Sequence, residues 1–254
     1  GNQFCQRLVD FLRACVKFDA GIVLAYPDNA LLVLHDELHV SDRAGFDGPY
    51  RNGMYLLSPI YSAASSGQRG CFHYPDITPE GFTESEFFDI YYSKNDTNDQ
   101  MVYLLETRAG TPIAISIERT SAMRKYTAKE RRTLDALWKL CAGIVQQHSW
   151  PEAANLADAA HPDMHAHVHS VLELFGSSVL TPRERDVVRL ILRGYPSKTV
   201  ARELEISAQT EQVHRKNIYQ KLSISSHSEL FTLFFDAITL PSSNTDPLLI
   251  LKTS

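Results

Sequence analysis

The spacing of apolar residues predicts a helix at the start of the chain and two pairs of strands after it. The apolar residues of that helix recur at helical spacing and share one face: Phe4, Leu8, Phe11, Leu12 and Cys15. Apolar runs at 21–26 and 30–35 are separated by a Pro-Asp-Asn turn, which favours a hairpin. Runs at 101–107 and 112–118 flank an Ala-Gly-Thr turn and predict a second hairpin.

A long amphipathic helix is predicted after the second hairpin. It starts at Thr127 and ends near His148, and its apolar residues repeat at helical spacing: Leu134, Leu137, Trp138, Cys141, Ile144 and Val145. Residues 53–64 and 84–93, between the hairpins, also favour helix. This order predicts an antiparallel sheet flanked by helices, and therefore an α+β domain over residues 3–150.

Four further helices are predicted beyond residue 178 from their capping residues, which makes this part all-α. Thr181 and Glu184 can form a capping box around Pro182, and Gly194 ends that helix. The next three helices begin near serines that can cap them: Ser197, Ser207 and Ser226. A short helix, a tight turn and a longer basic helix form a helix-turn-helix, whose last helix enters the major groove of DNA.

Charge separates these two parts of the chain. The 254 residues contain 25 Lys and Arg against 30 Asp and Glu, a net charge of -5 that by itself argues against nucleic acid. Residues 1–177 carry a net charge of -7, whereas residues 178–236 carry +2. A basic module can bind phosphates on an acidic chain because salt screens charge beyond ~8–10 Å. We therefore expect a DNA-binding domain at 178–240, preceded by a linker at 151–177.

The C-terminal residues resemble the DNA-binding domain of LuxR-type transcription factors. The resemblance rests on Leu180 to Glu184, Gly194, Val200, Ala201, Leu204, Ile206, Ser207, Thr210, His214, Asn217, Ile218, Lys221 and Leu222. It implies a tetrahelical fold and a homodimer on an inverted DNA repeat, with RNA polymerase as a further partner. It implies DNA contacts at Thr210, Gln212, Val213, Arg215 and Lys216, with Lys221 placing the helix against the DNA backbone.

Two positions depart from the pattern of that family. The family usually has Val and then Lys after the recognition-helix threonine, where this chain has Glu211 and Gln212. The Val position normally faces the small core, so Glu211 must find a partner or turn outward. The missing lysine removes one phosphate contact, which should weaken non-specific binding, and Gln212 can read adenine instead.

The region between the hairpins is rich in aromatic residues, which suits an apolar pocket with a few polar groups. The candidate effector residues are Tyr55, Tyr61, Phe72, Tyr91 and Tyr92, with Asp99 as a polar anchor. The element order resembles GAF or PAS sensor domains and the ligand domain of LuxR-type regulators. The lactone receptors of that family carry Asp-Pro where this chain has Ser58-Pro59, and the tryptophans expected nearby are absent. An acyl-homoserine lactone is therefore disfavoured.

Other classes of function are disfavoured too. The residues after the first strand do not form the acidic pair of a phosphorylation receiver, and no alternating series of strands and helices follows. No GxSxG, HExxH, phosphate-binding or dinucleotide-binding motif supports an enzyme or a cofactor. The linker histidines lack a strong acidic or thiolate partner for a metal, and we expect them on a solvated helix: His161, His165, His167 and His169. Without a long apolar run or a signal sequence, we expect a cytoplasmic protein with no membrane contact.

We interpret the chain as a bacterial-type one-component transcription regulator whose N-terminal domain binds a small effector and controls DNA binding by a homodimer. Dimer contacts are expected from the helix at 127–148 and from the fourth helix of the DNA-binding domain, near 230–235. One alternative is an N-terminal domain that only dimerises or docks a protein. The other is a redox sensor, although the four cysteines have no CxxC spacing and are expected to be buried thiols: Cys5, Cys15, Cys71 and Cys141.

Overall fold

The computed structural model describes residues 2–38, 46, 50–51, 53–85, 87–88, 96–150, 162–241 and 245–251. The chain forms two compact units. The first consists of Gly1–Thr78 and Lys94–His165, and the second of Pro79–Ser93 and Ala166–Ser254. The predicted residues Tyr91, Tyr92 and His161, with most of the helix predicted at 84–93, lie outside the described residues.

The first unit is built on an antiparallel sheet of five strands in the order β2-β1-β5-β4-β3. The strands are β1 (Ala20–Ala25), β2 (Leu32–Asp36), β3 (Gly70–His73), β4 (Thr97–Glu106) and β5 (Pro112–Thr120). Both predicted hairpins are confirmed, as β1–β2 and β4–β5. The edge strand β3 was not predicted, because its four residues are too short to show an alternating pattern.

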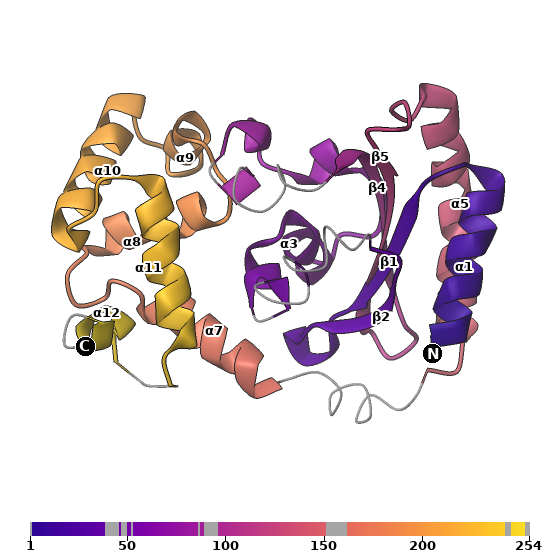
Figure 1. Ribbon diagram of the computed structural model, residues 1–254, viewed down its shortest axis with the longest axis horizontal. Helices are drawn as coiled ribbons and strands as arrows, with labels where there is room; N and C mark the ends of the chain where they lie inside the picture. The colour runs from indigo at the N-terminus through magenta and orange to yellow at the C-terminus, as the bar shows by residue number, and fades with distance from the viewer. Residues whose placement is uncertain are drawn as a thin grey trace. The chain divides into compact units, whose positions relative to one another are not determined.

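Helices cover both faces of this sheet (Figure 1). Helices α1 (Asn2–Cys15) and α5 (Ala128–Gln147) pack on one face, and α3 (Pro59–Ser65) lies on the other. The core under α1 and α5 takes alternate strand residues, as a pleated sheet requires, including Val23, Tyr103 and Ile115. The helix predicted at 53–64 is divided, since η3 (Met54–Leu57) precedes α3 and a proline opens α3. Short 3₁₀ turns complete the connections: η1 (Pro27–Asn29), η4 (Tyr74–Ile77) and η5 (Phe82–Glu84).

A buried arginine fixes the start of α5. Thr127 and Glu130 form a reciprocal capping box there. The side chain of Arg119 is 1% exposed, donates to Glu130 Oε1 at 3.0 Å and to Lys17 O at 2.7 Å, and lies over the ring of Tyr126. These hydrogen bonds, that of Arg119 first, hold the pKa of the Glu130 carboxyl far below its usual range.

The second unit contains the predicted tetrahelical domain, which is formed by α8 (Pro182–Leu192), α9 (Ser197–Glu203), α10 (Ala208–Leu222) and α11 (His227–Thr239). Helix α7 (Pro162–Leu174) precedes this domain in the chain, and α12 (Pro247–Leu251) follows it. The capping box of Thr181 and Glu184 is confirmed, and Gly194 ends α8 with φ of 81°. The backbone turns between α9 and α10 through Glu205, which takes the left-handed conformation at φ of 53°. The predicted combination of an α+β domain and an all-α domain is therefore confirmed.

Three features of this unit differ from the sequence prediction. His167 was expected to be solvated, but it is buried, and its Nε2 lies 2.9 Å from Ile238 O. Within 230–235 of α11, where a dimer contact was expected, Leu230, Phe231 and Phe234 are buried inside the domain. Helix α12 was not predicted, and the buried Asp246 before it accepts hydrogen bonds from the backbone of Gly176 and Ser178.

Candidate nucleic-acid interface and effector site

Helix α10 presents one continuous polar face to solvent. Ser207 caps the helix by accepting from the backbone N–H of Thr210 at 3.0 Å, and the two hydroxyls lie 2.8 Å apart. Five exposed residues are spaced three or four apart, and therefore lie on one side: Gln209, Gln212, Val213, Lys216 and Gln220. The predicted contacts Thr210 and Lys221 are exposed beside this row. Val213 is 52% exposed, which is unusual for its type and leaves an apolar group facing outward on this helix.

The opposite side of α10 buries a carboxylate. Glu211 is 0% exposed, and its Oε1 lies 2.6 Å from Nη2 and 2.8 Å from Nε of Arg215. The hydroxyl of Ser197, at the start of α9, donates to Oε2 of the same carboxylate. Glu211 thus has two partners inside the domain, Arg215 on its own helix and Ser197 on α9, and the second contact joins α9 to α10.

Two predicted DNA-binding cations are therefore engaged within the domain. The side chain of Arg215 is only 13% exposed and holds Glu211. Lys221 Nζ lies 2.7 Å from Oε2 of the buried Glu184, so the capping carboxylate of α8 also binds the end of α10. Burial opposes ionisation of Glu184, but the hydrogen bonds from Lys221 and Thr181 prevail and lower its pKa. Among the described residues no ion pair includes Lys216, which is exposed on the outer face.

A segment from the first half of the chain packs on α9 and α11 within the second unit. Thr199 Oγ1 of α9 donates to Glu80 O at 2.8 Å, and the Arg202 guanidinium pairs with the Glu80 carboxylate. Phe82 is buried against Gly194, where a Cβ would lie 2.6 Å from its ring. Residues 79–93 follow β3 and precede β4, so this connection of the sheet forms part of the helical unit.

The described tyrosines on the α3 face of the sheet form a close cluster. The ring of Tyr26 lies 6.3 Å from that of Tyr55 and 5.2 Å from that of Tyr61, and the last two are 5.4 Å apart. The Tyr55 hydroxyl donates to Asn29 O at 3.2 Å, and burial raises its pKa well above the usual range. Ser58, between these tyrosines in the chain, is 0% exposed, and its hydroxyl has no hydrogen-bond partner among the described residues.

Phe72 and Asp99, both predicted to bind the effector, lie on opposite faces of the sheet. Phe72 on β3 pairs with Val102 and alternates with Cys71 and His73, so it lies on the α3 side with the tyrosines. Asp99 lies on the α5 side instead. Its carboxylate accepts from the backbone N–H of Tyr126 at 2.7 Å, and lies 2.6 Å from His73 Nε2.

A polar pocket surrounds this Asp99–His73 pair on the α5 side. Arg131 Nη1 lies 3.3 Å from His73 Nδ1. Because a guanidinium only donates, Nδ1 accepts and Nε2 carries the proton donated to Asp99. The cavity of about 340 Å³ is lined by Cys71, His73, Asp76, Met101, Ala128, Arg131, Arg132 and Asp135. It is separate from the tyrosine cluster, because the sheet lies between them.

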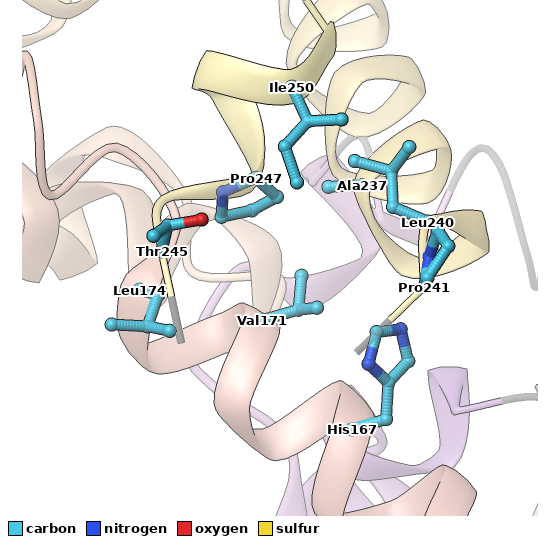
Figure 2. A pocket seen from close by; sticks show the side chains of 9 residues that line it. All are labelled: His167, Val171, Leu174, Ala237, Leu240, Pro241, Thr245, Pro247 and Ile250. Atoms are coloured by element: carbon cyan, nitrogen blue, oxygen red, sulfur yellow. The ribbon is translucent and has the colours of Figure 1, made fainter. Parts of the chain in front are cut away.

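A second pocket lies within the helical unit (Figure 2). Its lining comes from α7, α11 and the chain around α12: His167, Val171, Leu174, Ala237, Leu240, Pro241, Thr245, Pro247 and Ile250. Its volume of about 10 Å³ holds at most one water, so it is too small for an effector. It marks the seam along which α12 closes over α7 and α11.

The amino-acid sequence of the C-terminal domain matches a known family. Residues 178–234 fit the family described as bacterial regulatory proteins, luxR family. The C-terminal domain is a LuxR-type helix-turn-helix. Over this LuxR-type domain the chain is 46% identical to the nitrate/nitrite response regulator protein NarL of Escherichia coli, across 50 residues that cover 20% of this chain and 23% of NarL.

A longer match extends into the first unit. A protein of Aeromonas salmonicida assigned as an HTH-type transcriptional regulator is 27% identical over 168 residues, which cover 64% of this chain and 85% of that protein. Two similar solved structures are the VqsR LBD domain of Pseudomonas aeruginosa and SdiA of Escherichia coli. The first has a TM-score of 0.47 at 22% identity and covers 56% of this chain and 84% of that one. The second has a TM-score of 0.41 at 11% identity and covers 95% and 93%. No helix among the described residues is long and apolar enough to cross a membrane.

Proposed function

We propose that the protein is a one-component transcription regulator that binds double-stranded DNA through α10 and is controlled by a small effector. The observation that carries the DNA-binding part is the exposed face of Gln212, Val213 and Lys216 on the third helix of a LuxR-type domain. Side chains of these types recognise base edges and phosphates in the major groove.

DNA binding is tested with the full-length protein and a library of random duplexes. We expect repeated selection to enrich an inverted repeat with half-sites about 10 base pairs apart, as a symmetric dimer requires. Binding of all duplexes alike, or of none, would contradict a sequence-specific regulator.

The effector site that we propose is the tyrosine cluster on the α3 face. A buried hydroxyl without a partner costs about 1–3 kcal/mol, and a ligand acceptor beside Ser58 would remove that cost. Tyr55 and Tyr61 offer aromatic surface with hydroxyl groups. The ligand that fits is small and largely apolar or aromatic, with one or two polar groups. Ser58 in place of a carboxylate disfavours an acyl-homoserine lactone.

A thermal-shift screen with a metabolite library tests this site. We expect at least one compound to raise the melting temperature of the protein, and Ser58→Ala to reduce that shift. Ser62→Ala, on the exposed side of the same helix, is the matched control and should leave the shift unchanged. If no compound stabilises the protein while the dimer binds its DNA fully, the first unit only dimerises or docks a protein.

The redox alternative is disfavoured by three of the four thiols, whereas Cys15, which was expected to be buried, is exposed. Burial raises the pKa of Cys71 to about 12 and those of Cys5 and Cys141 to about 11, so these side chains stay as unreactive thiols at neutral pH. We expect the Cys71→Ser, Cys141→Ser double variant to bind DNA as the unchanged protein does, before and after treatment with peroxide. If peroxide changes DNA binding by the unchanged protein but not by this variant, the redox hypothesis would be supported instead.

A homodimer through α5 is the arrangement that we propose for DNA binding. Apolar residues spaced along the outer side of this helix include Ala136, Leu140 and Ile144. Leu140, at the middle of this row, is 50% exposed.

The segment 79–93 supports control of DNA binding by the first unit. Its two ends continue into β3 and β4, while Glu80 and Phe82 contact the helix-turn-helix. An effector that moves the β3–β4 connection would change these contacts, and with them the populations of DNA-binding geometries.

A further inference from the structure

The outer face of α10 has an unusual chemistry for a DNA-reading helix. Five of its exposed residues lie together on this face, and three of these are glutamines, one is valine and one is lysine: Gln209, Gln212, Val213, Lys216 and Gln220. Thr210 and Lys221 are also exposed at the margin of this face, and Lys221 is paired with Glu184. Arginine is the side chain that most often reads guanine, through O6 and N7. Glutamine pairs in the same bidentate way with adenine, and apolar groups contact the methyl group of thymine.

The one arginine of α10 is held away from that face. Arg215 lies on the inner side, where its Nε donates to the fully buried Glu211 and its Nη2 lies within ion-pair distance of the same carboxylate oxygen. The Ser197 hydroxyl holds the other oxygen of the same carboxylate, so the pair is fixed from α9 as well. Moving the guanidinium to DNA would leave a buried carboxylate unpaired, which costs several kcal/mol.

The N-terminal part of the helix decides which bases are read. In a helix-turn-helix the first turns of the recognition helix reach the base edges. The second turn of α10 presents Gln212 and Val213 next to each other, both exposed. Gln220 lies two turns further on, outside the part that reads bases.

We propose that this helix reads adenine and thymine, through Gln212 and Val213, and that Glu211 sets this preference by keeping Arg215 out of the groove. The inference rests on the proposed DNA binding. Glu211 acts as a positioning residue, because it touches Arg215 and not the DNA. The ligand is duplex DNA whose half-sites have A·T pairs at two adjacent positions under the second turn of α10.

The first test is the base composition of the selected half-sites. Selection from random duplexes with the full-length protein should return adenine at one position and thymine beside it. Gln212→Ala should remove the adenine preference and weaken binding by ~10–100-fold, the loss expected for one bidentate base contact. Gln220→Ala should change affinity by less than about threefold, since that turn lies beyond the reach of the bases.

The second test replaces the internal ion pair. In the double variant Glu211→Leu, Arg215→Leu, neither charge remains, and an apolar pair of similar size is tolerated in a core. We expect its half-site preference and its affinity to match those of the unchanged protein within about threefold. In Glu211→Val the free Arg215 should add guanine contacts. It should also steepen the slope of log K against log salt by the amount expected for about one more phosphate contact. Circular dichroism confirms that each variant keeps its helices.

The outcomes separate this inference from the proposed function. Half-sites with G·C pairs under Gln212, or a loss of more than tenfold in the double variant, would overturn the inference and leave DNA binding intact. Failure of the unchanged protein to select any DNA would overturn the proposed function and the inference with it.

Discussion

Each of two positive side chains of α10 is paired with a carboxylate that serves the fold. Arg215 holds Glu211, and Lys221 holds Glu184, which also caps α8. A cation in such a pair contributes mainly to the stability of the domain, whereas Lys216 on the outer face is available to phosphates and bases. The same residue type therefore has two different roles five positions apart on one helix.

The two lysines can be separated by paired measurements. Lys216→Ala should weaken DNA binding by about 1–3 kcal/mol without changing the melting temperature, because its side chain lies in water in the free protein. Lys221→Ala should lower the melting temperature by ~4–8 °C, the effect of about 1 kcal/mol in a domain of roughly 60–100 residues, with little effect on DNA affinity. Fluorescence anisotropy and thermal denaturation measure both quantities. Equal losses of DNA affinity in both variants would contradict this division.

Glu130 makes the first unit sensitive to acid. Its folded-state pKa lies far below that of an unfolded glutamate, because Arg119 and Thr127 hold the ionised carboxylate. Its contribution is therefore complete above about pH 4.3, the unfolded value, and is lost progressively as the pH falls below it. In denaturant titrations between pH 6 and pH 3 we expect the free energy of unfolding to fall less steeply in Glu130→Gln. Parallel curves for the two proteins would show that the carboxylate does not contribute in this way.

At the scale of elements, capping residues and hydrophobic spacing predict most of the helices. The helix start at Thr127 and the caps at Thr181, Ser207 and Ser226 are confirmed, because a cap is a local interaction within four residues. The cap predicted at Ser197 is wrong, since Pro196 precedes α9 and Ser197 is its first residue. Strand β3 and helix α12 were missed, since each is short and depends on a distant partner: β4 for the strand and the α7–α8 turn for Asp246. The partners of Glu211 could not be predicted either, because Ser197 lies on another helix.

The close approach of Phe82 to Gly194, at the end of α8, can be tested by replacing two glycines separately. Gly194 and Gly110 both have positive φ, at 81° and 86°, so alanine causes similar backbone strain at each. A Cβ at 194 also meets the ring of Phe82, whereas a Cβ at 110 meets no atom within 4 Å. We expect Gly194→Ala to lower the free energy of unfolding by ~1–3 kcal/mol more than Gly110→Ala, the range for overpacking. Equal losses would show that Phe82 moves aside freely.

The outer side of α5 gives the prediction for the dimer. Leu140→Asp should yield a monomer in sedimentation experiments and should weaken binding to an inverted repeat, since a charge at the centre of an apolar interface is costly. Lys139→Glu, at the neighbouring exposed position, is the matched control and should remain dimeric. A dimer that survives Leu140→Asp unchanged would remove α5 as the interface.

At the scale of the whole molecule, one connection of the sheet belongs to the helical unit. Residues 79–93 leave the first unit after β3 and return to it before β4. Within the second unit, Glu80 pairs with Arg202, which lies on the first helix of the helix-turn-helix, the helix that crosses the DNA backbone. The Glu80 carboxylate is thus paired with a guanidinium that could otherwise bind a phosphate. The hydrogen bond from Arg202 lowers the pKa of Glu80.

Removing this carboxylate should strengthen DNA binding. We expect Glu80→Ala to raise affinity severalfold at low salt and to steepen the slope of log K against log salt by about 0.9, the value for one added phosphate contact. Glu84→Ala, exposed on the same segment, should leave both quantities unchanged. An affinity that falls in Glu80→Ala would mean that the pair helps to present α9 to DNA.

Because the chain enters the second unit and then returns to the first, the order of synthesis also limits the order in which its parts can fold. The antiparallel pair of β4 and β5 can form soon after synthesis, while Phe82 and Phe87 still lack their partners in the helical unit. Those partners, Gly194 and Phe231, are translated more than 100 residues later. Until then two large aromatic side chains remain uncovered in the nascent protein, which favours association with chaperones. For the same reason, a fragment that starts after the linker lacks Phe82 and Phe87, which are buried in the second unit, and we expect it to be less stable than the same domain in the whole chain.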